Sequence, residues 1–327
     1  MKTVQHSRTD SGVLRIAAPA KVNLFLEVLG RRNDGFHEIE TLMVQVGLCD
    51  TLSVEETAPA QVHLEVVKSG DCEEFGVQLP DSGRDNLVWR AAESLRQHTK
   101  CPRGARIVLE KRIPIGAGLG GGSSDAAATL RLLDLLWQLA LPTEELMSLA
   151  ASLGSDVPFF LNGPVAWCRG RGELVEPFSG MFPCWFLLLS PAMLVSTARV
   201  YQHVRIPEQP RSGSELVVRL REKNVEALRS ALFNRLEEAA LLAYPQLRAI
   251  RETLDVCGLS HAQLSGSGGT FFAVFAVAEE AHQAAEDFQR HYASHGGVPV
   301  RTIVVPSLLS APTPEGKPPE SAQNDPR

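Results

Sequence analysis

A glycine-rich segment near the middle of this 327-residue chain carries the strongest local sign of chemistry. Five glycines fall within residues 116–122, and two serines follow them, between a predicted strand and a predicted helix. Glycine lets backbone N–H groups approach an anion closely, and the start of a helix adds unpaired N–H groups and the positive end of its dipole. The segment therefore predicts a phosphate-binding loop rather than a flexible turn.

Two common phosphate-binding motifs do not account for this loop. Gly116, Gly118 and Gly121 have the dinucleotide-binding spacing, but that motif needs an acidic residue at the end of the next strand, about 20 residues further on. Here Asp134 lies within the following predicted helix. The loop is not a P-loop either, because no Gly-Lys-Ser/Thr ends it. The residues indicate a phosphate cradle in a nucleotide enzyme of another type.

Three further places carry groups that could take part in chemistry. Lys21 and Asn23 lie on the same face of a predicted half-buried strand, because residues two apart in a strand share a face. Residues 264–270 form a second glycine-serine segment, which is either a hairpin or a loop that packs on the first one or touches a ligand. Asp156 follows a predicted helix among apolar residues, where a carboxylate is either a surface cap or a catalytic group in a dry pocket.

The elements that must position these groups are predicted from hydrophobic periodicity and turn residues. Helices and strands interleave without a strict strand–helix–strand rhythm, which favours an α+β protein over a doubly wound parallel sheet. A turn is expected at residues 33–35. The expected strands are 13–28, 44–54, 61–67, 105–115, 185–189, 261–264, 270–277 and 300–305. The expected helices are 86–99, 125–140, 143–153, 225–243, 246–257 and one that carries Ala281 to Tyr292 on one face.

The domain organisation is predicted from changes in composition. We expect a flexible N-terminus over residues 1–12, an N-terminal domain over 13–170, a C-terminal domain over 171–305 and a proline-rich tail over 306–327. That tail contains six of the 21 prolines and few large apolar residues. Because it buries too little surface to offset its ordering entropy, we expect it to be disordered, with Pro312 to Arg327 mobile and dispensable for activity.

Charge, cysteine usage and hydropathy exclude several classes of protein. A net charge of −6 with no Lys/Arg block argues against a nucleic-acid binder. The N-terminus lacks the apolar core of a signal peptide, and no apolar segment is long enough to span a bilayer. The six cysteines are scattered, which favours reduced thiols over a disulfide framework or a zinc site, and His291 with His295 lacks a third ligand. We expect a soluble cytoplasmic protein with no membrane partner and no metal-ligand cluster of its own.

Taken together, three segments resemble the signature regions of the GHMP kinase superfamily of small-molecule kinases. These are PAKVNLFL at 19–26, PIGAGLGGGSS at 114–124 and LSGSGGT at 264–270. Within the superfamily the sequence is most similar to the 4-diphosphocytidyl-2-C-methyl-D-erythritol kinase family, which has an A-K-x-N-L strand followed by G-x-R-x-D-G-Y-H. Here the corresponding segments are AKVNL at 20–24 and GRRNDGFH at 30–37, and GSDVPFF at 154–160 also fits. The resemblance covers roughly residues 16–305.

Two positions depart from the family pattern. Phe36 stands where tyrosine is usual, so an aromatic face is kept and a hydroxyl is lost. Gly269 stands where alanine is common, which is a small change.

The resemblance implies a fold, a reaction and a set of partners. It implies an N-terminal domain of the ribosomal-protein-S5 domain 2 type and a ferredoxin-like C-terminal domain, with substrates bound in the cleft between them. The implied reaction transfers the γ-phosphoryl group of ATP to the 2-hydroxyl of the methylerythritol unit, in the non-mevalonate isoprenoid pathway. ATP is the expected phosphoryl donor, with Mg²⁺ bound to it. We expect a monomer or a weak homodimer whose partners are small molecules.

The resemblance also assigns roles to individual residues. Asp156 corresponds to the catalytic base and Lys21 to the cation that orients it. The expected ATP-binding residues are Pro114, Ile115, Gly116, Ala117, Gly118, Leu119, Gly120, Gly121, Gly122, Ser123 and Ser124. The expected substrate-binding residues are Asn23, Phe36, His37, Thr197 and Tyr201, although a role for Tyr201 as a core aromatic is equally compatible with the sequence.

Two other functions stay open from the sequence. One is another small-molecule kinase of the superfamily, of the homoserine or mevalonate-pathway type, although residues 31–37 argue against it. The other is a catalytically inactive nucleotide-binding sensor, although the presence of both Lys21 and Asp156 argues against it.

Overall fold

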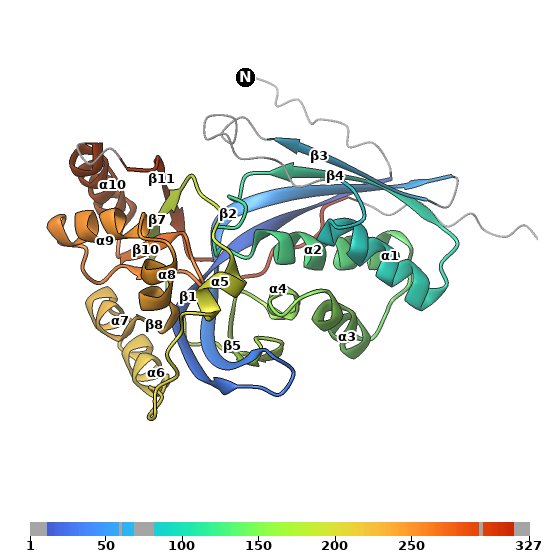
Figure 1. Cartoon of the computed structure of the whole chain (residues 1–327). Helices are drawn as coiled ribbons and strands as arrows, with labels where there is room; N and C mark the ends of the chain where they lie inside the picture. The colour runs from blue at the N-terminus through green and yellow to red at the C-terminus, as the bar shows by residue number, and fades with distance from the viewer. Residues whose placement is uncertain (1–11, 59–60, 69–81, 294–296, 317–327) are drawn as a thin grey trace, which may run out of the picture.

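The computed structural model describes residues 12–58, 61–68, 82–293 and 297–316 (Figure 1). The first part of the chain forms a large mixed sheet of seven strands within these residues, in the order β3-β4-β2-β1-β8, with β5 paired to β2 and β6 paired to β5. The strands are β1 (Val13–Arg31), β2 (His37–Thr57), β3 (Val62–Lys68), β4 (Gly104–Lys111), β5 (Val165–Gly170), β6 (Leu174–Pro177) and β8 (Phe233–Asn234). Four helices lie together on one side of this sheet in Figure 1: α1 (Leu87–Thr99), α2 (Gly121–Leu136), α3 (Thr143–Leu153) and α4 (Val157–Asn162).

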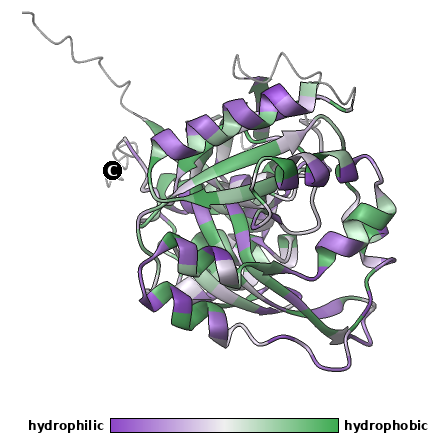
Figure 2. Cartoon of the chain, turned by 90° about the vertical axis from the view of Figure 1, so that its left-hand side faces the viewer, coloured by the Kyte–Doolittle hydropathy of each residue, from purple (hydrophilic) through white to green (hydrophobic). Residues whose placement is uncertain are grey.

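In the later part of the chain, the described residues form a smaller sheet of four strands in the order β11-β7-β10-β9. Its strands are β7 (Trp185–Pro191), β9 (Gln263–Leu264), β10 (Phe271–Phe275) and β11 (Val300–Pro306). Its helices are α5 (Thr197–Tyr201), α6 (Ser214–Arg221), α7 (Val225–Ala231), α8 (Leu236–Ala243), α9 (Leu247–Val256) and α10 (Ala278–Tyr292). Hydrophilic and hydrophobic residues alternate along the helical ribbons in Figure 2, and in α10 the buried residues are Ala281, Ala285, Phe288 and Tyr292. The prediction of an α+β protein is confirmed.

The long hairpin of β1 and β2 connects the two parts. β2 pairs with β4 near one end and with β5 near the other, while β1 pairs with β8. The prediction of a half-buried first strand is wrong, because nearly every residue of β1 from Ile16 to Val28 is buried. The second part of the chain packs on this strand, and one hydrophobic cluster joins Val22 of its apolar face to Phe186 and Phe272 of the smaller sheet. The polar face is buried as well, with Lys21 and Asn23 only 3% and 2% exposed.

A buried ion pair reinforces this connection. Glu27 of β1 is fully buried and accepts two hydrogen bonds from the Arg235 guanidinium, at 2.6 and 2.7 Å. Its carboxylate also accepts hydrogen bonds from the backbone N–H groups of Val28 and Arg211, each at 2.9 Å. These hydrogen bonds hold the pKa of Glu27 below its usual value, although burial alone would raise it.

Most of the expected helices and strands are confirmed, and the errors have local causes. The predicted helix 225–243 is split into α7 and α8, because Phe233 and Asn234 leave the helix to pair with β1 as β8. Helix α2 begins at Gly121, inside the glycine-rich segment, rather than at residue 125. The elements β5, β6, α4, α5 and α6 are absent from the prediction.

Residues beyond β11 return to the large sheet. Ser307 forms a bridge with Val46, and Glu315 exchanges backbone hydrogen bonds of 2.9 and 2.7 Å with Arg15 of β1. The expected tail is therefore tied to the sheet up to Glu315, while residues 317–327 and the expected flexible N-terminus up to residue 11 lie outside the described residues. The boundary at residue 171 stays a prediction, and β6 beyond it belongs to the large sheet.

Among the described helices, none combines the length and apolar character needed to cross a bilayer.

Candidate active site

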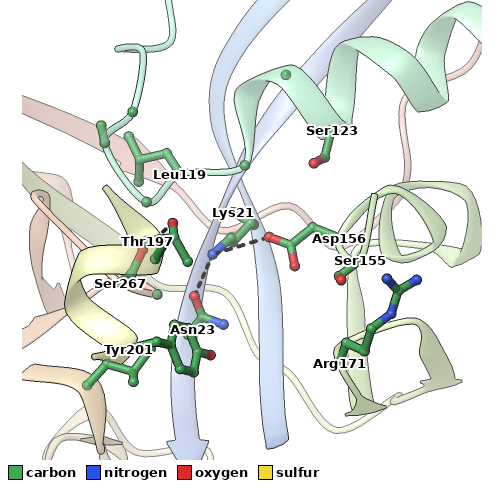
Figure 3. Close-up of a pocket in the computed structure, with 18 of the residues that line it drawn as sticks. Lys21, Asn23, Leu119, Ser123, Ser155, Asp156, Arg171, Thr197, Tyr201 and Ser267 are labelled. Atoms are coloured by element: carbon green, nitrogen blue, oxygen red, sulfur yellow. Dashed lines mark hydrogen bonds and ion pairs between the residues drawn. The ribbon is translucent and has the colours of Figure 1, made fainter. Parts of the chain in front are cut away.

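A cavity of 1220 Å³ opens where the two parts of the chain meet. Residues from β1, the glycine-rich segment, the turn before α4, helix α5 and the second glycine-serine loop line it (Figure 3). The cavity brings together the predicted site residues Lys21, Asn23, Phe36, His37, Pro114–Ser123, Asp156, Thr197 and Tyr201. Ser124 does not line it: its side chain is buried in the first turn of α2, and its hydroxyl has no hydrogen-bond partner among the described residues.

The backbone of the glycine-rich segment is oriented by hydrogen bonds to its carbonyl oxygens. Five consecutive carbonyls, those of residues 116–120, accept hydrogen bonds, four of them from other segments and the fifth from the first turn of α2. The donors are Val195 N (3.4 Å), Thr270 N (3.1 Å), Ser265 Oγ (2.9 Å), Lys21 N (2.9 Å) and Ser124 N (2.9 Å), in that order. Because the negative ends of these peptide groups are engaged by the protein, the loop is suited to present N–H groups to an anion. The start of α2 adds its unpaired N–H groups at the same place.

The two glycine-rich loops touch one another at Gly118. This residue has φ +76°, and a Cβ atom added there would lie 2.2 Å from the carbonyl oxygen of Ser265 and 2.8 Å from that of Gly268. Glycine is therefore required both for the backbone conformation and for the close approach. Both alternatives for residues 264–270 hold: the segment joins the antiparallel strands β9 and β10 as a hairpin, and its loop packs on the first loop. Gly266 and Ser267 also line the cavity.

Lys21 and Asp156 face each other inside the cavity. The Lys21 ammonium lies 3.8 Å from Asp156 Oδ2, which is an ion pair rather than a hydrogen bond, and it donates a 2.6 Å hydrogen bond to Asn23 Oδ1 (Figure 3). Asn23 Nδ2 donates in turn to Thr41 Oγ1 at 2.9 Å, and Thr41 donates to the Phe25 carbonyl at 2.6 Å. Burial lowers the pKa of Lys21, and the negative charge of Asp156 opposes this shift. This chain of bonds fixes the ammonium beside the carboxylate.

The carboxylate of Asp156 is available for chemistry. Asp156 occupies the position before α4, yet its side chain makes no capping hydrogen bond to that helix. Its side chain is 34% exposed, and this exposure is into the cavity. Of the two alternatives for this residue, the geometry favours a carboxylate held in a pocket over a helix cap.

Aromatic side chains line the cavity beyond Asn23. The rings of His37 and Tyr201 lie 4.8 Å apart with an interplanar angle of 32°. Burial lowers the pKa of His37, the charge of Arg31 adds to this shift, and the neutral ring is therefore favoured. Burial raises the pKa of Tyr201, and the charge of Asp156 adds to that shift. Phe36 is half exposed, and the guanidinium of Arg171 lies 5.0 Å from the centre of its ring. This wall can stack on a planar base and offer a neutral imidazole to it.

Thr197 joins the same region from helix α5. Its hydroxyl is within hydrogen-bond distance of the Ser267 hydroxyl, at 2.8 Å. The contact connects the start of α5 to the second glycine-serine loop, and both elements lie beside Lys21 in the cavity (Figure 3).

Two groups of buried polar residues were missed by sequence reasoning. Lys111 bridges Asp50 and Asp125, with 2.8 Å to Asp125 Oδ2, directly beneath the start of α2. Asp50 also accepts hydrogen bonds from the backbone N–H groups of Arg112 and Ile113. The other oxygen of Asp125, Oδ1, has no hydrogen-bond partner among the described residues. Burial is the main cause that raises the pKa of Asp125, to about 8. The residues of this cluster are far apart along the chain, so no local motif could have revealed it.

The second group centres on Asn234 of β8, which supports the second loop. Its side-chain amide donates to the carbonyl oxygens of Leu264 and Gly266, at 2.6 and 2.8 Å, and its oxygen accepts from Leu236 N at 2.9 Å. Gly266 in turn lies against the Lys21 ammonium, since a Cβ atom there would be 3.0 Å from Nζ.

A metal ion would have to be bound largely by a substrate. In the parts of the chain that the structure describes, no three His, Cys, Asp or Glu side chains are grouped closely enough to form a metal site. Mg²⁺ in nucleotide enzymes needs only one or two protein oxygens, because phosphates and water supply the rest. Ser123 and Asp156 both present oxygen atoms to the cavity, and so they fit such an ion.

Comparisons with known proteins match this architecture. Residues 86–164 match the family model of the GHMP kinases N terminal domain, and residues 216–294 match that of the GHMP kinases C terminal domain. A 4-diphosphocytidyl-2-C-methyl-D-erythritol kinase of Alkaliphilus metalliredigens is 35% identical over 282 residues, covering 85% of this chain and 94% of that protein. The corresponding kinase of Pelotomaculum thermopropionicum is 40% identical over 280 residues, with coverages of 85% and 94%.

Solved structures show the same fold. A crystal structure of 4-(cytidine 5'-diphospho)-2C-methyl-D-erythritol kinase superposes with a TM-score of 0.71 at 34% identity, covering 89% of this chain and 98% of that one. A homoserine kinase from Cytophaga hutchinsonii superposes with a TM-score of 0.68 at 19% identity, covering 96% of this chain and 99% of that one, and it shares the fold. The expected two-domain GHMP kinase fold is confirmed. The chain belongs to the GHMP kinases, in the family of the 4-diphosphocytidyl-2-C-methyl-D-erythritol kinases.

Proposed function

We propose that this chain transfers the γ-phosphoryl group of ATP to the 2-hydroxyl of 4-diphosphocytidyl-2-C-methyl-D-erythritol, in the non-mevalonate pathway to isoprenoid precursors. One observation carries the proposal: the Lys21–Asp156 pair lies in a single cavity between a phosphate-binding loop and a wall of aromatic side chains. The family relatives, which are kinases of this substrate by name, support it.

Asp156 acts as the general base in this mechanism. Its carboxylate takes the proton of the attacking hydroxyl as the new bond to the γ-phosphorus forms and the bond to the leaving ADP oxygen breaks. A positioned base of this kind contributes about 10²–10⁴-fold to the rate. The Lys21 ammonium, fixed by Asn23, holds the carboxylate in place and offsets negative charge that develops on the transferred group.

The glycine-rich segment and the start of α2 bind the triphosphate. Their N–H groups can hold the phosphates, and the hydroxyl of Ser123 can donate to them. Mg²⁺ bound to ATP would be held by the phosphates with the Ser123 hydroxyl, and it would neutralise charge on the transferred group. Phe36, His37 and Tyr201 bind the cytosine base by stacking and hydrogen bonding.

We place this reaction in the cytoplasm. The five cysteines in the described residues are all free thiols, which suits a reducing compartment. We propose that the enzyme works as a monomer or a weak homodimer, which sedimentation at several protein concentrations would test.

A substrate panel combined with one variant tests the function. The protein should phosphorylate the cytidyl substrate and not mevalonate or homoserine. Asp156→Asn should lower kcat at least about a hundredfold and leave ATP binding unchanged, because only the proton acceptor is removed. Asp255→Asn, which changes an exposed carboxylate on α9, is the matched control and should keep full activity.

Each alternative function has a distinct outcome. Phosphorylation of mevalonate or homoserine, and not of the cytidyl substrate, would assign the chain to another kinase class. ATP binding with no turnover of any acceptor would indicate a nucleotide sensor. Unchanged turnover in Asp156→Asn would remove Asp156 from the mechanism.

A further inference from the structure

One cation of the cavity, Arg171, has no role in the phosphoryl transfer described above. It lies in the turn between β5 and β6 and lines the cavity with a side chain that is 27% exposed. Its Nη2 atom donates to the Ala151 carbonyl at 3.2 Å, and its Nε atom lies 3.8 Å from the carboxylate of Glu173. With the Phe36 ring 5.0 Å away, these contacts fix the plane of the guanidinium inside the cavity.

The turn that carries Arg171 lies directly against the proposed base. A Cβ atom added to the next residue, Gly172, would be 3.5 Å from Asp156 Oδ1 and 3.6 Å from the carbonyl oxygen of Ser155. In Figure 3, Arg171 lies on the side of Ser155 and Asp156 that faces away from Leu119 and Ser123 of the ATP-binding segment. The guanidinium is therefore on the acceptor side of the Lys21–Asp156 pair.

The chemistry of the acceptor requires a cation at such a position. The proposed substrate has a diphosphate between its cytidine, which stacks near Phe36, and its methylerythritol unit, which must reach Asp156. Lys21 is already bonded to Asn23 and paired with Asp156. A guanidinium can bind phosphate oxygens in a planar, bidentate manner, and Arg171 contacts Phe36 while the next residue packs on Asp156.

We propose that Arg171 is a specificity-determining residue that binds the diphosphate of the acceptor and so selects a nucleoside-diphosphate-linked alcohol over a free alcohol. This inference rests on the proposed function. It adds a residue that acts by electrostatic recognition of the acceptor, separate from the base and from the ATP-binding loop.

Equilibrium binding of cytidine and of CDP tests the proposal directly. Calorimetry on the full chain, with the ATP site filled by a non-hydrolysable ATP analogue, should show tighter binding of CDP than of cytidine. Arg171→Gln should weaken CDP binding about tenfold to a hundredfold, the usual range for a lost charged hydrogen bond, and change cytidine binding much less. In turnover, the KM for the cytidyl substrate should rise by a similar factor, while kcat and the KM for ATP stay within about twofold.

Control variants separate this role from a structural one. Arg169→Gln, two residues earlier, removes an exposed guanidinium that pairs with Glu40 and Glu176 and does not line the cavity, so it should keep the preference for CDP. Arg171→Lys keeps the charge but not the planar geometry and should keep part of that preference. It also provides the test if Arg171→Gln does not fold.

Three results would overturn the inference. Equal losses of cytidine and CDP binding in Arg171→Gln would mean that Arg171 acts only through Phe36. Loss of the CDP preference in Arg31→Gln instead would transfer the role to that neighbouring cation of the cavity. A large fall in kcat with unchanged CDP binding would place Arg171 on the transferred phosphoryl group. If the wild-type chain neither binds cytidine nor phosphorylates the cytidyl substrate, the proposed function itself is wrong.

Discussion

Replacement of Gly118 by alanine tests whether the contact between the two glycine-rich loops is as close as the structure indicates. The added Cβ atom would lie 2.2 Å from the Ser265 carbonyl oxygen and 2.8 Å from that of Gly268. Both are backbone atoms, so the clash cannot be relieved by rotation of a side chain. The two loops must therefore separate by about 1 Å before the methyl group fits, since carbon and oxygen atoms in contact need more than 3 Å.

The free-energy cost of this change has two parts. Holding alanine at φ +76° costs roughly 1–2 kcal/mol. Separation of the loops also breaks the Ser265–Gly118 and Thr270–Ala117 hydrogen bonds, at about 1 kcal/mol each. The sum is a loss of roughly 3–4 kcal/mol, a large share of the 5–15 kcal/mol that is typical of a folded domain.

Urea unfolding measures the loss of stability, and steady-state kinetics measures the change in the KM for ATP. The midpoint should fall in Gly118→Ala, and the KM for ATP should rise, because the displaced loop no longer presents its N–H groups to phosphate. Gly122→Ala is the matched control for the stability measurement alone: its Cβ atom would make an ordinary 3.6 Å contact with Leu87, and alanine in helix α2 should stabilise the fold by roughly 0.5–1 kcal/mol. A Gly118→Ala protein as stable as the wild type would refute the close contact.

Two further outcomes follow from the buried carboxylate cluster and from the C-terminal residues. The pKa of Asp125 is raised from 3.8 to about 8 in the folded chain. Between these two pH values the folded state keeps a proton on Asp125 that the unfolded state releases. The free energy of unfolding therefore falls as the pH rises from 3.8 to about 8. Asp125→Asn should therefore show a smaller loss of stability than the wild type between pH 5 and pH 8; equal pH slopes would contradict the raised pKa. Truncation after Ala311 removes the two hydrogen bonds between Arg15 and Glu315 and should cost about 1–2 kcal/mol in urea unfolding while kcat/KM stays within about twofold. Loss of activity in a truncated protein that still folds would show that the tail serves catalysis.

Sequence patterns predicted those parts of the molecule whose structure depends on neighbouring residues. The glycine-rich segment predicted a loop that leads into a helix, and the start of α2 at Gly121 confirms this, because glycine stereochemistry and a helix start are local properties. Helices α3 and α10 were predicted from the spacing of their apolar residues, as in the buried Ala281, Ala285, Phe288 and Tyr292. The side-by-side placement of Lys21 and Asn23 followed from strand geometry and is confirmed by their hydrogen bond.

The remaining errors concern contacts between distant segments. The split at Phe233 arises from pairing with β1, and the burial of β1 arises from the second part of the chain. Neither partner is visible in a local window of sequence. The same holds for the Lys111 cluster, since a lone Asp50 or Asp125 has no pattern that distinguishes it from a solvated residue. The approach of Arg171 to Phe36 likewise depends on the path of the whole sheet.

The anchoring of the ATP-binding segment has a consequence for how the protein acquires activity. Its five carbonyl oxygens are held by donors from β1, from α2, from Val195 in the loop between β7 and α5, and from the second loop, so the segment contacts both early and late parts of the chain. Three of these donors belong to residues 195, 265 and 270. A nascent chain that has not yet produced them leaves the carbonyls of residues 116–118 without these bonds. We therefore expect nucleotide affinity to emerge only when synthesis and folding of the second part are complete.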